Sequence, residues 1–331
     1  MKYIIEKYLN LFDLIKIEAK NYHITLTDHG AGIIDLKTYD KDNNLSSIAL
    51  GYDDLKLFYK DDDYYFGKTI GRIAGRIENG TYSLNDKIYN LEINDKKLNS
   101  NLHSGTNSIS FQNFEYNIIA NDKIKVIFTI FERKSDFIAP MKYKVVYTLD
   151  EDSFTIENYA YSTIDTICNM TNHVYFNLSG DFKSNILDHE VQMDGLIYKD
   201  GNTLKYINEV FDFTKPKKFK THIDDLSLEA TKGYDHYFKF NKNKTVKVTE
   251  PNSKRYLEVS GNSNGVVIYT GGYFHGRKSQ ANTEYKIHDG FTLEFQNMPN
   301  GINTEYLDEK SILKANSTFY QIIKYKFGVD K

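Results

Sequence analysis

The sequence predicts an all-β protein, a large β-sandwich that forms a single domain over residues 1–331. Apolar and polar residues alternate along many short segments, as they do in strands with one buried face. Turn signals separate these segments about every 8–12 residues, a spacing typical of sandwiches and barrels. The chain holds 27 Tyr and 21 Phe but only 4 Pro, and aromatic residues favour strands. No Pro/Gly/Ser-rich linker divides the chain.

The first third of the chain predicts one short helix followed by hairpins. Lys2–Leu11 has a helical periodicity, so we expect a helix there. The segment Ile24–Leu36 is expected to form a hairpin that turns at Asp28–Gly30. A second hairpin is expected from Tyr82–Leu84 and the alternating residues of Tyr89–Ile93.

The remaining elements are all predicted as strands. Val126–Phe131 is a continuous apolar run, which predicts a strand buried on both faces. Tyr143–Leu149 and Phe154–Asn158 alternate on either side of Asp150–Ser153, which predicts a hairpin. Four later strands are expected at Val246–Thr249, Tyr256–Ser260, Val266–Thr270 and Phe291–Phe295.

Composition excludes several classes of protein. A net charge of −3 and a pI near 6.3 leave no basic surplus for binding nucleic acid. No apolar run approaches the roughly 18 residues of a membrane span, and the N-terminus lacks a secretory signal. The single cysteine, Cys168, cannot form an internal disulfide, and we expect it to be a small buried hydrophobe. These features predict a cytoplasmic protein that binds neither nucleic acid nor membrane.

Standard metal and nucleophile motifs are missing from the sequence. The nine histidines form no H-E-x-x-H motif, and there is no C-x-x-C or G-x-S-x-G motif. Asp188, His189 and Glu190 are consecutive, and adjacent strand residues point to opposite faces. We therefore expect no metal site.

The stretch Thr171–Gly180, TNHVYFNLSG, holds the first candidate for proton transfer, His173. Asn172, Asn177 and Tyr175 flank the histidine and are suitable hydrogen-bond partners for a buried imidazole. Taken alone, this stretch favours a histidine with a structural role.

Glu294 is the second candidate, because it shares one face of an otherwise apolar strand with Gln296. An inward-facing carboxylate is costly unless it is paired or functional. Arg72 and Arg76 lie in an apolar, glycine-spaced run; such arginines usually form structural ion pairs, but one that faces a cleft could grip sugar hydroxyls.

Two further polar residues have ordinary explanations of their own. His103 lies in a loop, where a solvated residue is the usual case. Asp235 lies in a polar turn, where a capping role is usual.

Taken together, these stretches resemble the aldose 1-epimerases, or galactose mutarotases. The motifs follow the family pattern in order over most of the chain: GRIAGRIENG (71–80), NLHSG (101–105), NHVYFNLSG (172–180), FDF-x-KP (211–216), GYDH (233–236), VVIYTGG (266–272) and LEFQNMPN (293–300).

The resemblance implies a β-supersandwich with an open sugar cleft and no cofactor. It implies that Glu294 is the general base on the anomeric hydroxyl and His173 the general acid on the ring oxygen. It also implies that His103 lies beside the sugar ring. Arg76, Asp235 and Tyr175 are expected to bind the substrate, an aldohexose such as galactose or glucose, in a monomer or homodimer.

Four positions depart from the family pattern. Gly75 replaces the usual Asn, Ser104 replaces a Gly, and Phe295 stands where Thr is common. Val267 stands where many members carry a Gln that contacts the sugar, so the choice of sugar is left open.

Anomer exchange needs a proton removed from the C1 hydroxyl and a proton delivered to the ring oxygen. We expect Glu294 and His173 to straddle the pyranose and to do this at neutral pH. Reference pKa values of about 4.3 for Glu and 6.5 for His suit the two roles with only small shifts.

Three alternatives remain. A hexose-6-phosphate 1-epimerase would need a cationic cluster at the cleft, and the arginines are few: Arg72, Arg76, Arg133, Arg255 and Arg277. A non-catalytic sugar-binding protein would have no need of Glu294 and His173. A glycosidase would use Asp235 and Glu294 as its carboxyl pair.

Overall fold

Most segments in which apolar and polar residues alternate form antiparallel strands. The computed structural model describes residues 1–60, 63–132, 135–275 and 284–330. Within these ranges it contains three main sheets, four two-stranded sheets and one short α-helix, α1 (Leu55–Lys60). This confirms the predicted all-β class. Arg133 and Arg277 lie outside the described residues.

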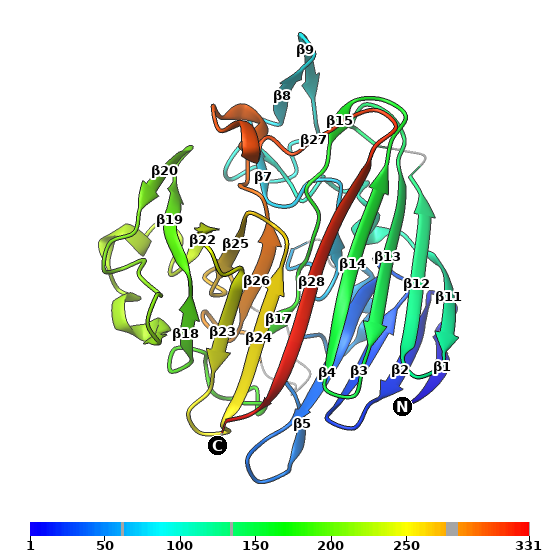
Figure 1. Cartoon of the computed structure of the whole chain (residues 1–331), viewed down its shortest axis with the longest axis vertical. Coiled ribbons are helices and arrows are strands. Elements are labelled where there is room, and N and C mark those ends of the chain that lie inside the picture. Colours follow the sequence, from blue (N-terminus) through cyan, green and yellow to red (C-terminus); the bar gives the residue numbers. More distant parts are fainter. Residues whose placement is uncertain (61–62, 133–134, 276–283, 331) are drawn as a thin grey trace.

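The largest sheet has nine strands (Figure 1). Its order is β11 (Glu115–Ala120), β12 (Ile124–Phe131), β13 (Lys142–Leu149), β14 (Ser153–Tyr161), β28 (Thr318–Val329), β24 (Arg255–Gly261), β23 (Thr245–Thr249), β18 (Glu190–Met193) and β21 (Lys217–Lys218). The five-stranded sheet follows chain order: β1 (Lys2–Tyr8), β2 (Phe12–Glu18), β3 (Tyr22–Thr27), β4 (Gly32–Tyr39) and β5 (Leu45–Ser47).

The six-stranded sheet has the order β17 (Tyr175–Phe176), β26 (Phe291–Gln296), β25 (Gly265–Tyr269), β22 (Asp235–Phe240), β19 (Gly195–Asp200) and β20 (Thr203–Tyr206). The two-stranded sheets pair β10 (Ser100–Leu102) with β7 (Arg76–Glu78), β15 (Thr166–Ile167) with β27 (Ile312–Leu313), β16 (Thr171–Asn172) with β6 (Thr69–Ile70), and β8 (Thr81–Leu84) with β9 (Lys87–Asn90). Short 3₁₀ turns lie at Ile109–Phe111, Phe219–His222, Leu226–Leu228, Gly301–Asn303 and Leu307–Glu309.

The inward faces of the three main sheets share one cluster of buried apolar side chains. Tyr22 of β3 meets Phe327 of β28 edge-to-face, with ring centroids 4.7 Å apart. Phe176 of β17 lies 6.2 Å from Tyr325 of β28, which joins the six-stranded sheet to the nine-stranded one. Each such ring contributes roughly 1.5–3 kcal/mol when it leaves water. This shared core holds β17 and β26 in place.

Most predicted strands are confirmed. The hairpin of Ile24–Leu36 is β3 and β4, and the hairpin around Asp150–Ser153 is β13 and β14. The four later strands are β23, β24, β25 and β26.

The helix predicted at Lys2–Leu11 is wrong. Lys2–Tyr8 is strand β1, paired antiparallel with β2. Leu9 and Asn10 have φ values of 48° and 57°, so the chain reverses there. Local helical periodicity was outweighed by pairing with the adjacent β2 segment.

Two other strand predictions need correction. Val126–Phe131, in β12, is not buried on both faces, because Thr129 and Phe131 are exposed and only alternate residues face the core. The predicted return strand Tyr89–Ile93 ends early, because β9 stops at Asn90.

Cys168 is buried, as predicted for a small hydrophobe. Burial raises the pKa of its thiol, so the thiol is not activated as a nucleophile. No helix in the described part of the chain is both long and apolar enough to cross a membrane.

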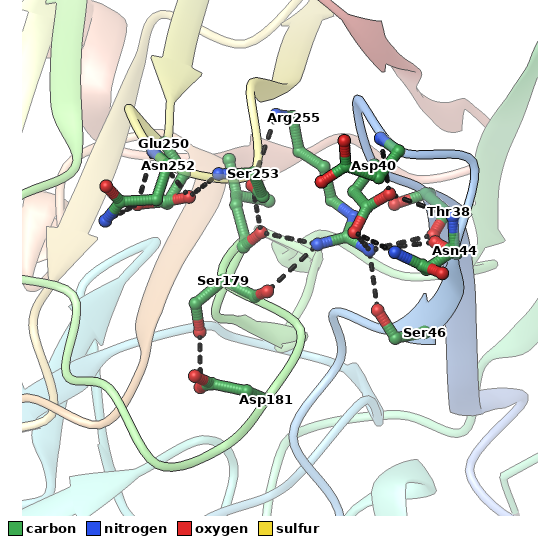
Figure 2. Close-up of polar contacts among 12 residues, drawn as sticks. Thr38, Asp40, Asn44, Ser46, Ser179, Asp181, Glu250, Asn252, Ser253 and Arg255 are labelled. Carbon is green, nitrogen blue, oxygen red and sulfur yellow. Dashed lines mark hydrogen bonds and ion pairs between the residues drawn. The ribbon is translucent and has the colours of Figure 1, made fainter.

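Arg255, at the start of β24, joins two segments that are distant in the sequence. Its guanidinium donates to the carbonyls of Leu178 and Ser179, at 3.2 and 2.9 Å, after β17. It also donates to Asn44 O at 3.2 Å and to Ser46 Oγ at 2.6 Å, near β5. Figure 2 shows Ser179 on one side of this guanidinium and Asn44 and Ser46 on the other. The cation therefore fixes the end of the stretch that carries His173.

Replacing Arg255 by methionine is expected to lower the free energy of unfolding by about 3–5 kcal/mol, because several buried carbonyl groups lose their donor. Urea unfolding measures this change. The control is Lys254→Met on the adjacent exposed residue, which should change stability by less than about 0.5 kcal/mol. Equal stability of the two variants would contradict the structural role of Arg255.

Candidate active site

Strands β26, β25 and β22 place a row of side chains along one wall of a cleft of about 860 Å³. Glu294 lies opposite Val267 in the β25–β26 register, and Val267 lies opposite Tyr237 in the β22–β25 register. All three residues line the cleft. The cleft is therefore built across the six-stranded sheet.

Glu294 lines this cleft and is buried, with 4% of its surface exposed. The hydroxyl of Thr292, two residues earlier on the same face of β26, donates to Glu294 Oε1 at 3.1 Å. Burial raises the pKa of Glu294 to about 8, and the charge of Asp235 adds to this, while Thr292 and Arg76 oppose it. The carboxyl group is thus largely protonated at neutral pH.

His173 lies in the short connection between β16 and β17, where its backbone is held on both sides. Its N–H donates to Lys68 O at 2.9 Å, and its carbonyl accepts from Gly67 N at 3.0 Å. These bonds present its ring to the cleft, where His173 Nε2 lies 3.4 Å from Glu294 Oε1. The two candidates for proton transfer are therefore in direct contact.

The amides that flank His173 do not hold its ring, contrary to expectation. Asn172 Nδ2 donates to Gly67 O at 3.2 Å. Asn177 Nδ2 donates to Ser184 O and Asp289 O at 2.7 and 2.9 Å. Asn172 thus holds Gly67, whose N–H donates to the His173 carbonyl, and Asn177 holds two backbone carbonyls further along the chain.

The expectation of small pKa shifts is also wrong. Burial lowers the pKa of His173 to about 3, with a smaller opposing effect from its own backbone. Because burial also raises the pKa of Glu294 to about 8, the pair carries one proton and no net charge over a broad pH range, with that proton on Glu294 in the resting protein.

His103 lies beside the pair with a fixed tautomer. Its φ is +50°, and its Nδ1 accepts a hydrogen bond from Gly75 N at 3.2 Å. The ring proton is therefore on Nε2. The His103 ring lies 5.0 Å from that of His173, edge-to-face, and 4.8 Å from that of Tyr65. Burial, together with the charges of His173 and Arg76, lowers the pKa of His103 well below its usual value, so the ring is neutral.

The two candidate arginines have different environments. Arg76 lines the cleft; its Nε donates to Asp95 Oδ2 at 2.8 Å, and its Nη1 lies 3.8 Å from Asp235 Oδ2. Arg72 is fully buried, pairs with Glu132 and donates to Ile138 O at 2.8 Å. Only Arg76 is therefore placed to meet a ligand, with Asp235 beside it.

Tyr175 of β17 also lines the cleft. Its ring lies 5.0 Å from that of His173 and 5.9 Å from that of Tyr269. The structure thus brings all six predicted site residues to one cleft.

His103, His173 and Glu294 could in principle hold a metal ion, since their ligand atoms lie within 4.8 Å of one another. Coordination through His103 Nε2 would move the ring proton to Nδ1, where the Gly75 N–H already donates. Two donors would then face each other, so these residues fit a metal poorly.

The positions that depart from the family pattern have identifiable surroundings. Gly75 has φ +72°, and a Cβ there would lie 2.8 Å from Pro299. Ser104 Oγ accepts from Ile73 N at 2.7 Å, and Phe295 is fully buried on the core side of β26. Val267 presents an apolar surface to the cleft directly beside Glu294.

Four further residues at the site belong to no recognised motif. Tyr65, Asp95 and Lys199 line the cleft, and Thr292 is fully buried and donates to Glu294. Thr292 could have been found from its spacing, since residues two apart on a strand share a face. Asp95, Tyr65 and Lys199 come from distant segments, and no sequence signal connects them to the site.

Acidic side chains outnumber basic ones around the cleft. The basic lining residues among those described are Arg76, Lys97 and Lys199, and the acidic ones are Asp63, Glu78, Asp95, Asp200, Asp235 and Glu294. Arg76 is already engaged by Asp95 and Asp235. This balance favours an uncharged ligand over a phosphorylated one.

Comparison with known proteins places similar sequences in one family. A family model described as aldose 1-epimerase matches residues 13–326. Galactose mutarotase of Homo sapiens is 31% identical over 98% of this chain and 94% of its own length. Aldose 1-epimerase of Haemophilus influenzae is 30% identical over 96% of each chain.

Solved structures share the fold. A GalM/aldose epimerase homologue from C. elegans superposes with a TM-score of 0.88 at 23% identity, covering 97% of this chain and 100% of its own. Galactose 1-epimerase from Lactobacillus acidophilus superposes with a TM-score of 0.84 at 23% identity, covering 100% and 99%.

Proposed function

Because this chain belongs to the aldose 1-epimerase family and is accordingly an isomerase, we propose that it interconverts the α and β anomers of free aldohexoses such as galactose and glucose. The observation that carries this proposal is the buried contact of His173 Nε2 with Glu294 Oε1, 3.4 Å apart in the cleft. Acid–base catalysis of anomer exchange needs no more than a positioned proton acceptor and a positioned proton donor.

In the proposed reaction, Glu294 accepts the proton of the C1 hydroxyl while His173 gives a proton to the ring oxygen. The C1–O5 bond breaks and leaves an open-chain aldehyde. Rotation about C1–C2 and reclosure, with the two proton transfers reversed, gives the other anomer. The sequence suggested a pair that straddles the ring, but Glu294 and His173 lie side by side. This suits the reaction, because both reacting oxygens are bonded to C1.

The protonation state needed for catalysis is reached by proton transfer from Glu294 to His173. In the resting protein the proton lies on Glu294, since burial raises the pKa of Glu294 and lowers that of His173. Transfer of that proton across the contact gives an ionised Glu294 and a protonated His173 without changing the net charge. Binding of the sugar favours this form, because the C1 hydroxyl donates to the carboxylate and the ring oxygen accepts from the imidazolium.

We assign substrate binding to the remaining predicted residues. His103 presents a fixed Nε2–H to the cleft. Arg76 offers donors and Asp235 offers acceptors for sugar hydroxyls. Their opposite charges partly cancel, because the two groups form an ion pair. Tyr175 provides an aromatic face next to His173. No cofactor takes part in these steps.

The proposal predicts a particular pH dependence. The active pair carries one proton, so kcat/KM is expected to stay level from about pH 5 to 7 and to fall above about pH 8, where that proton is lost. Unshifted groups would instead lose activity above about pH 6.5, as His173 deprotonates. Measuring kcat/KM from pH 5 to 9, corrected for the spontaneous rate, distinguishes the two. A fall centred near pH 6.5 would contradict the shared-proton account.

Three alternatives are tested with purified protein. Faster anomer exchange with free glucose than with glucose 6-phosphate supports the proposal, and the reverse preference supports a hexose-6-phosphate 1-epimerase. Sugar binding without accelerated exchange would indicate a binding protein. Release of sugar from a glycoside would indicate a glycosidase that uses Asp235 and Glu294.

We also propose that residues 1–331 act as one domain, in a cytoplasmic monomer or homodimer that has no nucleic-acid partner. Light scattering of the purified chain measures its mass in solution. A species larger than a dimer would contradict this assignment.

A further inference from the structure

Lys199 is a cation in the cleft that none of the proposed steps uses. It lies on β19, one residue beyond the pair Tyr198–Phe238 of the β19–β22 register. Tyr198 faces the core, so Lys199, its neighbour on the strand, points to the opposite side and lines the cleft. Lys199 therefore extends the row of cleft-lining residues formed by Glu294, Val267 and Tyr237, and lies at its far end from Glu294.

Burial lowers the pKa of Lys199, and nearby carboxylates oppose this effect without cancelling it. The charges of Asp235 and Glu78 favour the ammonium form, and the charge of Arg76 disfavours it. Among the described residues, Lys199 has these charged neighbours but no hydrogen-bonded or ion-paired partner. The other lysine of this hairpin, Lys205, is paired, with its Nζ 2.5 Å from Asp200 Oδ2. A half-buried ammonium with unused donors at a ligand cleft needs an acceptor.

The spacing of the row fits a single sugar. Glu294, Val267, Tyr237 and Lys199 belong to four neighbouring strands. Strands lie about 4.8 Å apart, so the Cα atoms of Glu294 and Lys199 are separated by roughly 14 Å. The four-carbon side chain of Lys199 is long enough to extend over Tyr237, the adjacent residue of the row, so the ammonium group can lie closer to Glu294 than its Cα does. Neither Val267 nor the Tyr237 hydroxyl offers a donor in between, since the hydroxyl donates to Glu309 Oε2 at 3.1 Å.

We propose that Lys199 is a specificity-determining residue, whose ammonium donates a hydrogen bond to a hydroxyl oxygen at the end of the pyranose remote from C1. This rests on the proposed function, because Glu294 fixes the C1 end of the sugar. The excess of acidic groups around the cleft favours a neutral hydroxyl as the acceptor over a phosphate.

The test compares wild type with Lys199→Met on galactose and on its 2-, 3-, 4- and 6-deoxy derivatives. The expected loss in kcat/KM on galactose is about 10-fold and lies mainly in KM, because the contact is made equally in ground and transition states. For the one deoxy sugar that lacks the partner hydroxyl, the loss should shrink to less than about 2-fold. Lys205→Met is the control from the same hairpin and should leave all five sugars unchanged.

The outcomes are distinct. An equal loss on every sugar would show a structural role and overturn the proposal. So would a larger loss on galactose 6-phosphate than on galactose, since the acceptor would then be an anion, and so would unchanged kinetics. In each of these cases wild type still exchanges anomers. Failure of wild type to do so would instead overturn the proposed function itself.

Discussion

Replacing Glu294 by glutamine is expected to lower kcat for anomer exchange by about 10²–10⁴-fold, the usual contribution of a positioned acid–base group. Glutamine keeps the shape of the side chain and can still accept the Thr292 hydrogen bond, but it cannot take the proton of the C1 hydroxyl. Magnetisation transfer between the two anomeric ¹H NMR signals at equilibrium measures the rate directly.

The same variant should remain folded. Burial keeps Glu294 largely protonated in the resting protein, so an uncharged amide is a close substitute and the free energy of unfolding should change by less than about 1 kcal/mol at pH 7. Full activity of Glu294→Gln would exclude Glu294 as the base. If Glu294→Gln loses activity because it unfolds, the activity measurement is repeated with Glu294→Met.

Replacing His173 by glutamine is expected to lower kcat by about 10²–10⁴-fold as well, because the ring oxygen loses its proton donor. The pH dependence should also change sign. In wild type the active pair carries one proton, so activity falls above about pH 8. In His173→Gln the carboxylate alone remains and water supplies the proton, so residual activity should rise as Glu294 ionises toward pH 8.

The pH profile separates a chemical role of His173 from a structural one. A misfolded variant would lose activity at every pH without inverting the profile. Residual activity that still falls above pH 8 would contradict the assignment of the shared proton to His173 and Glu294.

Strand positions were largely predictable from the sequence because burial imposes a period of two. The hairpin around Asp150–Ser153 and the strand at Phe291–Phe295 follow that period and are found as expected. Lys2–Leu11 was not predictable in this way, because β1 is exposed along nearly its whole length and owes its conformation to pairing with β2. Its fold depends on a neighbour more than on its own pattern.

The six candidate site residues could be predicted because they lie in or next to motifs that resemble those of the aldose 1-epimerase family. All six line the same cleft. Their proton states could not be predicted, since reference pKa values do not contain the burial that moves Glu294 and His173 in opposite directions. Lys199 and Asp95 were missed for a topological reason: strand pairing brings them to the cleft from segments with no motif.

The central claim is most directly tested by the optical rotation of freshly dissolved α-D-galactose at pH 7, with and without the purified protein. Wild type is expected to bring the rotation to its equilibrium value much faster than buffer alone, in proportion to protein concentration, and Glu294→Gln is expected to do so hardly at all. A decay with wild type no faster than that in buffer, for galactose and for glucose, would contradict the central claim.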